Sequence, residues 1–291
     1  MNVLITGGSG FIGSHITDQC IEQGYKVRIL DIKEPHRSDV EFIEGSVVDR
    51  SLLKKSMQEI DYVYHLAAIS NIDHVKSKPI ETIEYNVMGT AYILEEAIKT
   101  QIKRFFLASS VFLYEKSGHL YTSSKEYSEI LCNNYKSLYD IPYTILRFGT
   151  VYGARSRQVD VISIFVSNAL KGEKLIIRNN GTQKRNFIYV EDLAMGSVLA
   201  MKTNKSLNKV LTISNEKSIS IIELSSIVNE IFNNKLEIQI TKEKKRYDDY
   251  IGNILNISET FSILNWKPQV DIKEGILRYI NWYKEHIKLK N

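Results

Sequence analysis

Residues 3–15 read VLITGGSGFIGSH: a short apolar run, a glycine-rich turn and the start of a helical pattern. Gly8, Gly10 and Gly13 fit the spacing GxGxxG, and Gly7, Gly10 and Gly13 fit GxxGxxG. Glycine permits a tight turn and lets backbone N–H groups at a helix start approach an anion. The stretch therefore predicts a strand, a phosphate-binding turn and a helix, in that order.

An acidic residue closes the next predicted strand. Asp31 follows the apolar residues 26–30 and stands eighteen residues after Gly13. A carboxylate there accepts hydrogen bonds from the ribose of a dinucleotide and repels a 2′-phosphate. This predicts NAD rather than NADP as cofactor, although Lys33 and Arg37 stand close enough to weaken the preference. A glycine turn without a ligand is the alternative, and the ordered strand, turn, helix, strand and acid argue against it.

The alternation of apolar runs and helical patterns predicts the fold class. Strands separated by helices indicate βαβ units and a doubly wound parallel sheet, an α/β Rossmann fold over residues 1–150. Its predicted strands cover residues 3–6, 26–30, 41–43, 62–66, 104–108 and 143–147, and its clearest helices cover 11–23, 80–98 and 123–138.

After residue 150 the rhythm changes, and residues 151–291 predict a smaller mixed α/β domain that binds the substrate, with some segments returning to the first domain. No Pro/Gly-rich linker separates the halves, so we expect them to pack together with a cleft between them. The predicted elements of this part are helices at 161–170, 220–232 and 279–286 and a strand at 175–177.

Composition excludes several classes of protein. The 291 residues are 43% hydrophobic and 25% charged, which suits a globular core, and no run approaches the ~20 apolar residues of a membrane span. The opening MNVLITGG lacks the basic region of a signal peptide. A net charge of +4 suits a small anionic ligand and falls short of a nucleic-acid-binding face.

The cysteines and histidines add two expectations. Cys20 and Cys132 form no CxxC pair, which fits a reduced, cytoplasmic protein. The six histidines show neither HxH nor HExxH spacing, so we predict no metal site. His65 lies in an apolar strand pattern and is interpreted as a core residue rather than a ligand.

A candidate catalytic pair follows the strand FFLASS. The segment YTSSK places Tyr121 and Lys125 four residues apart, a spacing that chance alone supplies in a chain with 17 tyrosines. Here the segment begins a helical pattern that follows a strand end carrying Ser109 and Ser110. Residues four apart on a helix share one face, so Tyr121 and Lys125 would point the same way. A lysine ammonium and an oxidised nicotinamide are expected to lower the tyrosine pKa from its usual value of about 10, which would make it a base. The alternative is an exposed tyrosine beside a salt-bridging lysine.

Motifs in a fixed order extend this pattern over nearly the whole chain. They are GGSGFIGSH (7–15), DYVYHLAA (61–68), NVMGT (86–90), ASSVFLY (108–114), YTSSK (121–125), LRFGTVYG (146–153), KRNFIYVEDL (184–193) and LNWKP (264–268). Together with Asp31 they resemble the extended short-chain dehydrogenase/reductase family, and more narrowly its NAD-dependent nucleotide-sugar epimerase/dehydratase branch, as in UDP-glucose 4-epimerases.

The resemblance implies roles for individual residues. Tyr121 would be the acid–base residue at the sugar hydroxyl, Lys125 would bind the nicotinamide ribose, and Ser110 would orient the sugar oxygen. The residues implied to bind or support NAD are Gly7, Gly10, Phe11, Ile12, Gly13, Asp31, Val48, Asp49, Leu66, Ala67, Ala68, Asn86, Tyr121 and Lys125. Those implied to bind the substrate are Ser110, Thr150, Arg185 and Arg246, with the two arginines on its pyrophosphate.

The chain also departs from the family pattern. Val111 and Phe112 stand where dehydratases carry an Asp–Glu pair, so a 4,6-dehydratase is not expected. Ser46 replaces a usual Asp, Thr150 replaces a usual Asn, and the segment between Ser110 and Tyr121 is short. These differences leave the identity of the sugar open.

The leading interpretation is therefore an NAD-dependent C4 epimerase of a UDP-sugar that works through a transient 4-keto sugar. A nucleotide-4-ketosugar reductase would use the same Tyr121 and Lys125. A decarboxylase of UDP-glucuronate type is less favoured, because this chain has no acid directly after Ser110. A non-catalytic NAD-binding regulator is also less favoured, because both the tyrosine and the lysine are present. The resemblance further implies a homodimer that pairs through the helices at 80–98 and 123–138.

Overall fold

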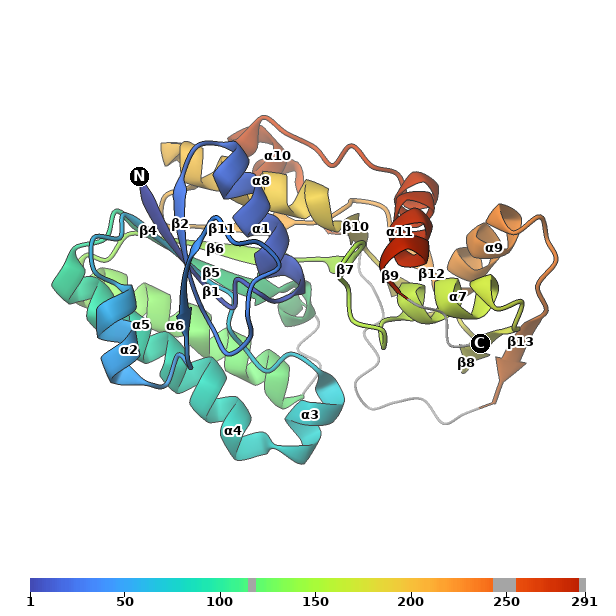
Figure 1. Ribbon diagram of the computed structural model, residues 1–291, viewed down its shortest axis with the longest axis horizontal. Helices are drawn as coiled ribbons and strands as arrows, with labels where there is room; N and C mark the ends of the chain where they lie inside the picture. Colours follow the sequence, from blue (N-terminus) through green and yellow to red (C-terminus); the bar gives the residue numbers. More distant parts are fainter. Residues whose placement is uncertain (115–118, 243–254, 288–291) are drawn as a thin grey trace.

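In the computed structural model, which describes residues 1–114, 119–242 and 255–287, a seven-stranded parallel sheet forms the larger lobe (Figure 1). The strand order β11-β6-β5-β4-β1-β2-β3 changes direction beside β1, which is where doubly wound sheets bind their ligands. The strands are β1 (Asn2–Thr6), β2 (Lys26–Asp31), β3 (Glu41–Glu44), β4 (Tyr62–His65), β5 (Arg104–Ser110), β6 (Tyr143–Phe148) and β11 (Lys209–Ile213).

Helices cover both faces of this sheet. One face carries α1 (Phe11–Glu22), α8 (Val190–Lys202) and α10 (Ser258–Leu264), and the other carries α2 (Arg50–Ser56), α5 (Gly89–Thr100) and α6 (Leu120–Tyr139) (Figure 1). Each face has its own apolar core, because strands buried on both sides are apolar almost throughout. The predicted doubly wound α/β fold is confirmed.

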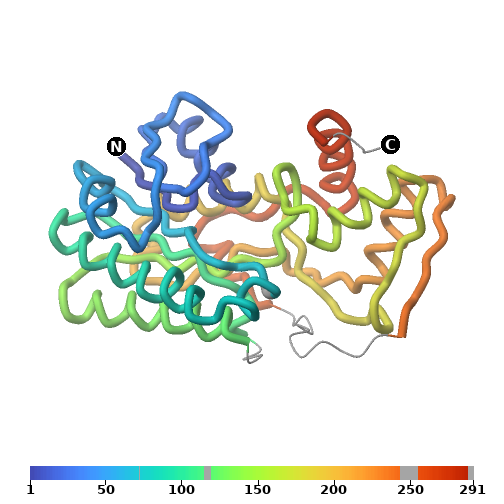
Figure 2. Tube along the Cα trace, turned by 60° about the horizontal axis from the view of Figure 1, so that its bottom comes forward, coloured from blue at the N-terminus to red at the C-terminus, as the bar shows by residue number. Residues whose placement is uncertain are grey.

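A smaller lobe lies beside the sheet (Figure 2). Its core gathers Phe165, Leu224 and Tyr279, all buried. Its strands form three two-stranded pairs, β7 with β10, β8 with β13 and β9 with β12. The elements are β7 (Thr150–Tyr152), α7 (Val161–Leu170), β8 (Leu175–Arg178), β9 (Lys184–Arg185), β10 (Phe187–Tyr189), β12 (Ile219–Ser220), α9 (Ile221–Ile231), β13 (Ile238–Thr241) and α11 (Ile272–His286).

The chain passes between the lobes more than once. After β7 to β10 in the smaller lobe, α8 packs against α1 and β11 pairs with β6 in parallel, so both belong to the larger lobe. After β12, α9 and β13, α10 returns to α8 and β11. Trp266, just after α10, packs tightly against Gly196 of α8, because a Cβ on Gly196 would lie 2.7 Å from the Trp266 ring.

Two predicted helices differ from the observed ones. Residues 80–98 do not form one regular helix: α4 (Pro79–Ile83) is followed by a π-helical turn η1 (Glu84–Met88) and then by α5. The wide turn lets Asn86 reach across to Ile69 and Ser124. The helix predicted at 279–286 already begins at Ile272, where Asp271 caps it by accepting from Glu274 N.

Three further short helices are α3 (Ile72–Ser77), η2 (Val111–Tyr114) and η3 (Asn204–Ser206). Over the described ranges, no helix combines the length and the apolar character that a bilayer crossing requires.

Candidate active site

A cavity of about 1500 Å³ follows the carboxyl ends of β1, β2, β4 and β5 and continues between the lobes to β7, β9 and β10. It brings together most of the residues predicted for the site. Those that line it are Gly7, Gly10, Phe11, Ile12, Gly13, Asp31, Leu66, Ala67, Ala68, Ser110, Tyr121, Lys125, Thr150 and Arg185. One cavity thus spans the predicted cofactor and substrate ends.

The glycine turn leaves room for an anion at the start of α1. Gly7 has a left-handed φ of 73°, and a Cβ there would lie 2.7 Å from Ala67 N. A Cβ on Gly13 would lie 2.1 Å from the Gly7 carbonyl oxygen, so the helix approaches the turn closely. No side chain caps α1 and its first turn holds no acid, which leaves its N–H groups and positive dipole end for a phosphate.

Asp31 ends β2 beside this turn. Its Oδ2 accepts from Ser9 N at 3.0 Å and its Oδ1 from Lys33 N at 3.1 Å. The buried Ser9 Oγ has no hydrogen-bond partner among the residues that the structure describes. A carboxylate with acceptor capacity to spare and an unpaired hydroxyl beside a glycine turn fit the diphosphate and ribose of a dinucleotide.

Two residues predicted beside the adenine lie elsewhere. Gly45, Ser46 and Val47 line the cavity, whereas Val48 and Asp49 do not. Asp49 instead caps α2: its Oδ1 accepts from Ser51 N at 2.9 Å and from Leu52 N at 3.1 Å. The helix cap gives this carboxylate a structural role, and its contact with the adenine stays a prediction.

Asn86 supports the cavity wall from behind. Its Oδ1 accepts from Ile69 N at 2.8 Å, and its Nδ2 donates to Ile69 O and to Ser124 Oγ, both at 3.0 Å. It thereby ties the loop after β4 to α6, the helix of Tyr121 and Lys125. Asn86 itself is buried outside the cavity lining.

Tyr121, Lys125 and Ser110 meet where β5 ends and α6 begins. Lys125 Nζ donates to Ala108 O at 2.8 Å and lies 5.9 Å from the centre of the Tyr121 ring. Ser110 Oγ accepts from Phe112 N at 3.2 Å and interacts with the Tyr121 hydroxyl. A phenol, an ammonium and a hydroxyl on one cavity wall form a unit that can move and stabilise a proton.

Burial sets the pKa values of this pair. It raises the pKa of Tyr121 to about 12, while the Arg157 charge and the Ser110 hydrogen bond act in the other direction. It lowers the pKa of Lys125 to about 8, partly opposed by the charge of Glu129. From the sequence we expected a lowered tyrosine pKa; among the protein's own groups desolvation of the phenolate dominates, and the shift is upward.

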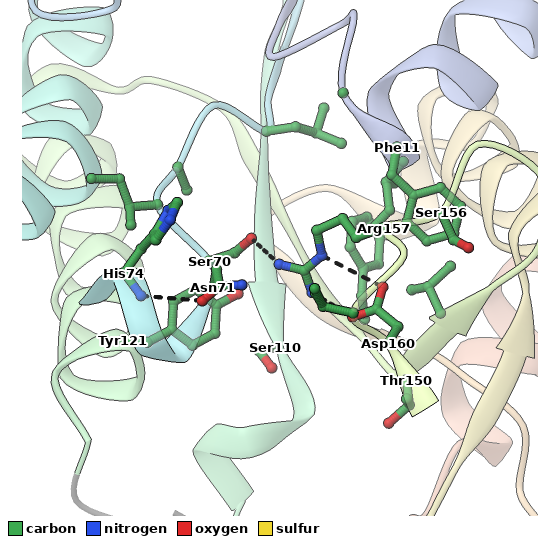
Figure 3. Close-up of a pocket in the computed structure, with 18 of the residues that line it drawn as sticks. Phe11, Ser70, Asn71, His74, Ser110, Tyr121, Thr150, Ser156, Arg157 and Asp160 are labelled. Atoms are coloured by element: carbon green, nitrogen blue, oxygen red, sulfur yellow. Dashed lines mark hydrogen bonds and ion pairs between the residues drawn. The ribbon is translucent and has the colours of Figure 1, made fainter. Parts of the chain in front are cut away.

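An ion pair on the substrate side of the cavity was not predicted from the sequence. Arg157 donates to Asp160 Oδ1 at 3.0 Å and to Ser70 Oγ at 3.4 Å, and it lies on the same side of the cavity as Thr150, with Tyr121 on the other side (Figure 3). The position of Arg157 shortly after β7, at the carboxyl end of a strand in LRFGTVYG, was the available signal.

Of the two arginines predicted to bind the pyrophosphate, only Arg185 lies within the described residues. Arg185 lines the cavity from β9, and its Nη1 donates to the Lys184 carbonyl at 2.8 Å. Arg246 lies outside the described residues. In the portion of the chain with assigned structure, no three His, Cys, Asp or Glu side chains gather as a metal site would require.

The parallel sheet, the glycine turn with its acid, and a Tyr–Lys pair on one cavity are features of an NAD-binding protein of the short-chain dehydrogenase/reductase type. The family model described as the NAD dependent epimerase/dehydratase family matches residues 3–214, and the chain belongs to this family. NAD is accordingly its cofactor, and the glycine turn, Asp31 and Ser9 fit it.

Known proteins resemble the chain over nearly its full length. A Methanocaldococcus jannaschii protein with the provisional name UDP-glucose 4-epimerase is 34% identical, covering 98% of this chain and 99% of its own. The UDP-N-acetyl-alpha-D-glucosaminuronate decarboxylase of Bacillus cytotoxicus is 29% identical and covers 97% of each chain. The solved UDP-glucuronic acid 4-epimerase of Bacillus cereus, in complex with UDP-glucuronic acid and NAD, is 28% identical with a TM-score of 0.89 and covers 98% of this chain and 99% of its own. The relatives thus share nucleotide-sugar substrates and differ in the reaction.

Proposed function

We propose that the chain is a nucleotide-sugar 4-epimerase that acts on a UDP-sugar. The observation that carries this proposal is the absence of an acid after Ser110: Val111 is buried and Phe112 is apolar, where a second acid would be needed to eliminate water. Asp160, a carboxylate that lines the cavity, is paired with Arg157. Epimerisation needs one reversible proton acceptor, and Tyr121 supplies it.

The residues support the following sequence of steps. The sugar C4 hydroxyl would give its proton to the phenolate form of Tyr121, which the Lys125 ammonium and the positive charge of NAD, when bound, would stabilise, while Ser110 holds the C4 oxygen. NAD, when bound, supplies reversible acceptance of the C4 hydride. The resulting 4-keto sugar rotates in the cavity. Tyr121 returns the proton to the C4 oxygen when the opposite face of the C4 carbonyl is reduced. A cavity of about 1500 Å³ exceeds the roughly 300–1,000 Å³ of ordinary ligand pockets and leaves space for this rotation beside a dinucleotide.

A second candidate is decarboxylation of a UDP-uronic acid. The decarboxylase relative supports it, and so does the Arg157 guanidinium on the substrate side of the cavity, which can hold a carboxylate. Both reactions begin with oxidation at C4 by the same Tyr121 and Lys125. They differ in whether the 4-keto sugar loses its carboxylate before it is reduced.

One experiment separates these reactions. The purified protein is mixed with UDP-glucose, UDP-galactose, their N-acetyl forms or UDP-glucuronic acid, without added cofactor, and the anomeric protons are followed by NMR. We expect a C4 epimer to appear, and Tyr121→Phe to abolish it. A pentose product would favour the decarboxylase. No conversion of any sugar, even with added NAD, would exclude the tested epimerase substrates and direct attention to NADH oxidation by a 4-keto nucleotide sugar.

We also propose a homodimer that pairs through the α4 to α6 side of the larger lobe. Apolar side chains are exposed there on adjacent helices, including Ile80 at 74% and Leu138 at 71%. The others are Ile83, Met88, Tyr127, Ile130 and Tyr139. Pairing two such faces would remove this apolar surface from water.

The larger lobe is proposed to bind NAD and the smaller lobe to bind most of the nucleotide sugar. Thr150, Arg157 and Arg185, which line the substrate end of the cavity, come from β7, β9 and the loop between β7 and α7. We place the enzyme in the cytoplasm, since Cys20 and Cys132 are both free thiols and buried.

A further inference from the structure

A buried carboxylate lies directly behind the Tyr121–Lys125 pair. Tyr121, Lys125 and Glu129 are spaced by four residues along α6, so they share one face of the helix. The Glu129 side chain is 9% exposed and does not line the cavity. It therefore cannot touch the substrate or the cofactor, and any part it takes in the reaction must pass through its neighbours.

Both oxygens of Glu129 are engaged. Oε1 accepts from Ser109 Oγ at 2.5 Å and from Arg147 Nε at 2.9 Å, and Oε2 accepts from Arg147 Nη2 at 2.6 Å. A bidentate arginine fixes the carboxylate in the plane of the guanidinium. Ser109 immediately precedes Ser110 at the end of β5, so the same carboxylate holds the strand end from which Ser110 reaches the cavity.

Glu129 also has two cationic neighbours, the buried Lys125 and the partly exposed Arg147. Lys125 and Arg147 approach it from α6 and β6, and Lys125 itself donates to the Ala108 carbonyl rather than to the carboxylate. The groups around this trio that can gain or lose charge are His65 on β4, Tyr114 on η2, Tyr121 and Cys132 on α6, and Tyr143 on β6.

Burial keeps the groups nearest this trio neutral. The pKa of His65 is lowered to about 3, and those of Cys132, Tyr121 and Tyr143 are raised. At neutral pH the local charges are therefore those of Lys125, Glu129 and Arg147.

We propose that Glu129 is a positioning residue for the reaction: through Ser109 it fixes the strand end that carries Ser110, and its negative charge keeps the Lys125 ammonium protonated at working pH. This inference rests on the proposed function only for the role of Lys125 in stabilising the Tyr121 phenolate. Without Glu129, the buried lysine would lose the negative charge that opposes its desolvation, and it would give up its proton more readily.

The geometry makes opposite predictions for the two partners of the ion pair. Glu129→Gln removes the anion, so the fall of kcat on the alkaline side should move to lower pH by about 1 unit. Arg147→Gln removes the cation that is paired with Glu129, so the carboxylate charge would act more strongly on Lys125 and the same limb should move to higher pH. Glu129→Asp keeps the charge and should keep the wild-type limb. Glu126→Gln removes an exposed carboxylate from the same helix and serves as the matched control.

The titration of Lys125 is also measured without turnover. The 13Cε resonance of lysine-labelled protein, assigned with Lys125→Arg, is followed against pH in the wild type and in each variant. We expect its midpoint to fall in Glu129→Gln and to rise in Arg147→Gln. A Glu129→Gln protein with lower kcat but an unchanged alkaline limb and an unchanged Lys125 titration would overturn the proposal and leave Glu129 a structural ion-pair partner.

Failure of the proposed function would look different. If the wild type converts no UDP-sugar but the Lys125 resonance shifts as stated, the electrostatic role of Glu129 stands and the epimerase assignment falls. If Glu129→Gln does not fold, the proposal is tested by Arg147→Gln alone. The midpoint of the Lys125 titration should then rise in Arg147→Gln, and an unshifted midpoint in that variant overturns the proposal.

Discussion

The preference for NAD depends on one carboxylate and on what its neighbours do. Asp31 keeps acceptor capacity toward the cavity while Ser9 N and Lys33 N hold it in place. Arg37, which the sequence left as a possible partner of a 2′-phosphate, instead pairs with Asp18 and Asp39, both at 2.6 Å. Its guanidinium is thus already paired with carboxylates, and Lys33, which lines the cavity beside Asp31, is the cation that can still weaken the preference set by Asp31.

Two aspartates that the resemblance grouped together should behave differently. Asp31→Ala removes an acceptor for ribose hydroxyls and is expected to raise the NAD dissociation constant roughly ten- to hundred-fold. Asp49→Ala removes a helix cap and is expected to lower the free energy of unfolding by about 1 kcal/mol while NAD affinity is unchanged. Calorimetric titration with NAD and urea unfolding measure the two effects; weaker NAD binding in Asp49→Ala would restore its role at the adenine.

Among single elements, β4 shows how a polar residue is accommodated in the sheet core. His65 is 1% exposed, with Nδ1 2.8 Å from Thr6 Oγ1 and Nε2 3.0 Å from Thr90 Oγ1. Burial lowers its pKa to about 3, so it is neutral in the folded protein at pH values where the unfolded chain binds a proton. This agrees with the core role expected from its apolar strand.

The pH dependence of stability should report this histidine. Between about pH 6.5 and pH 3 the unfolded state binds a proton that the folded state does not, so stability is lost as the pH falls. His65→Gln should reduce the slope of the unfolding free energy against pH in this window by about 1.4 kcal/mol per unit. His286→Gln, at an exposed position of α11, is the control, and an unchanged slope in His65→Gln would contradict the assignment.

The elements also show what the sequence can and cannot predict. The six strands predicted in the first half lie within two residues of observed ones, because each is a buried apolar run between glycine or polar turns. α8 was missed because it is buried on nearly all sides and has no polar face to reveal its period. The strands β9 and β12 are two residues long, too short to show any alternation.

The candidate site divides in the same way. Gly7 to Gly13, Asp31 and the Tyr121–Lys125 pair were predicted because each sits at a fixed distance from a recognisable strand. Three other site residues were not predicted, because they come from loops. Arg157 and Asp160 come from the loop after β7, and Ser70 comes from the loop after β4. Only the folded chain brings these loops to one cavity.

On the scale of the whole molecule, the exposed apolar face of α4 to α6 should determine the oligomeric state. We expect the wild type to elute at twice the 33.5 kDa chain mass in light-scattering chromatography, and Ile130→Asp to elute as a monomer. Leu277→Asp places the same charge at a 40% exposed apolar position of α11 in the smaller lobe and should leave the dimer intact. A monomeric wild type would remove the proposed interface.

The repeated passage of the chain between the lobes limits how such an enzyme can be recombined. A fragment that ends near residue 150 would lack the edge strand β11 and the helix α8 that packs against α1, so its sheet would lose an edge strand and one of its faces would keep only α1 as cover. A substrate lobe cannot be exchanged between relatives by a single crossover. It has to be moved as separate stretches, among them 150–189, 214–241 and 271–287. New sugar specificities in this fold are therefore more accessible through point changes along the cavity than through shuffling of modules.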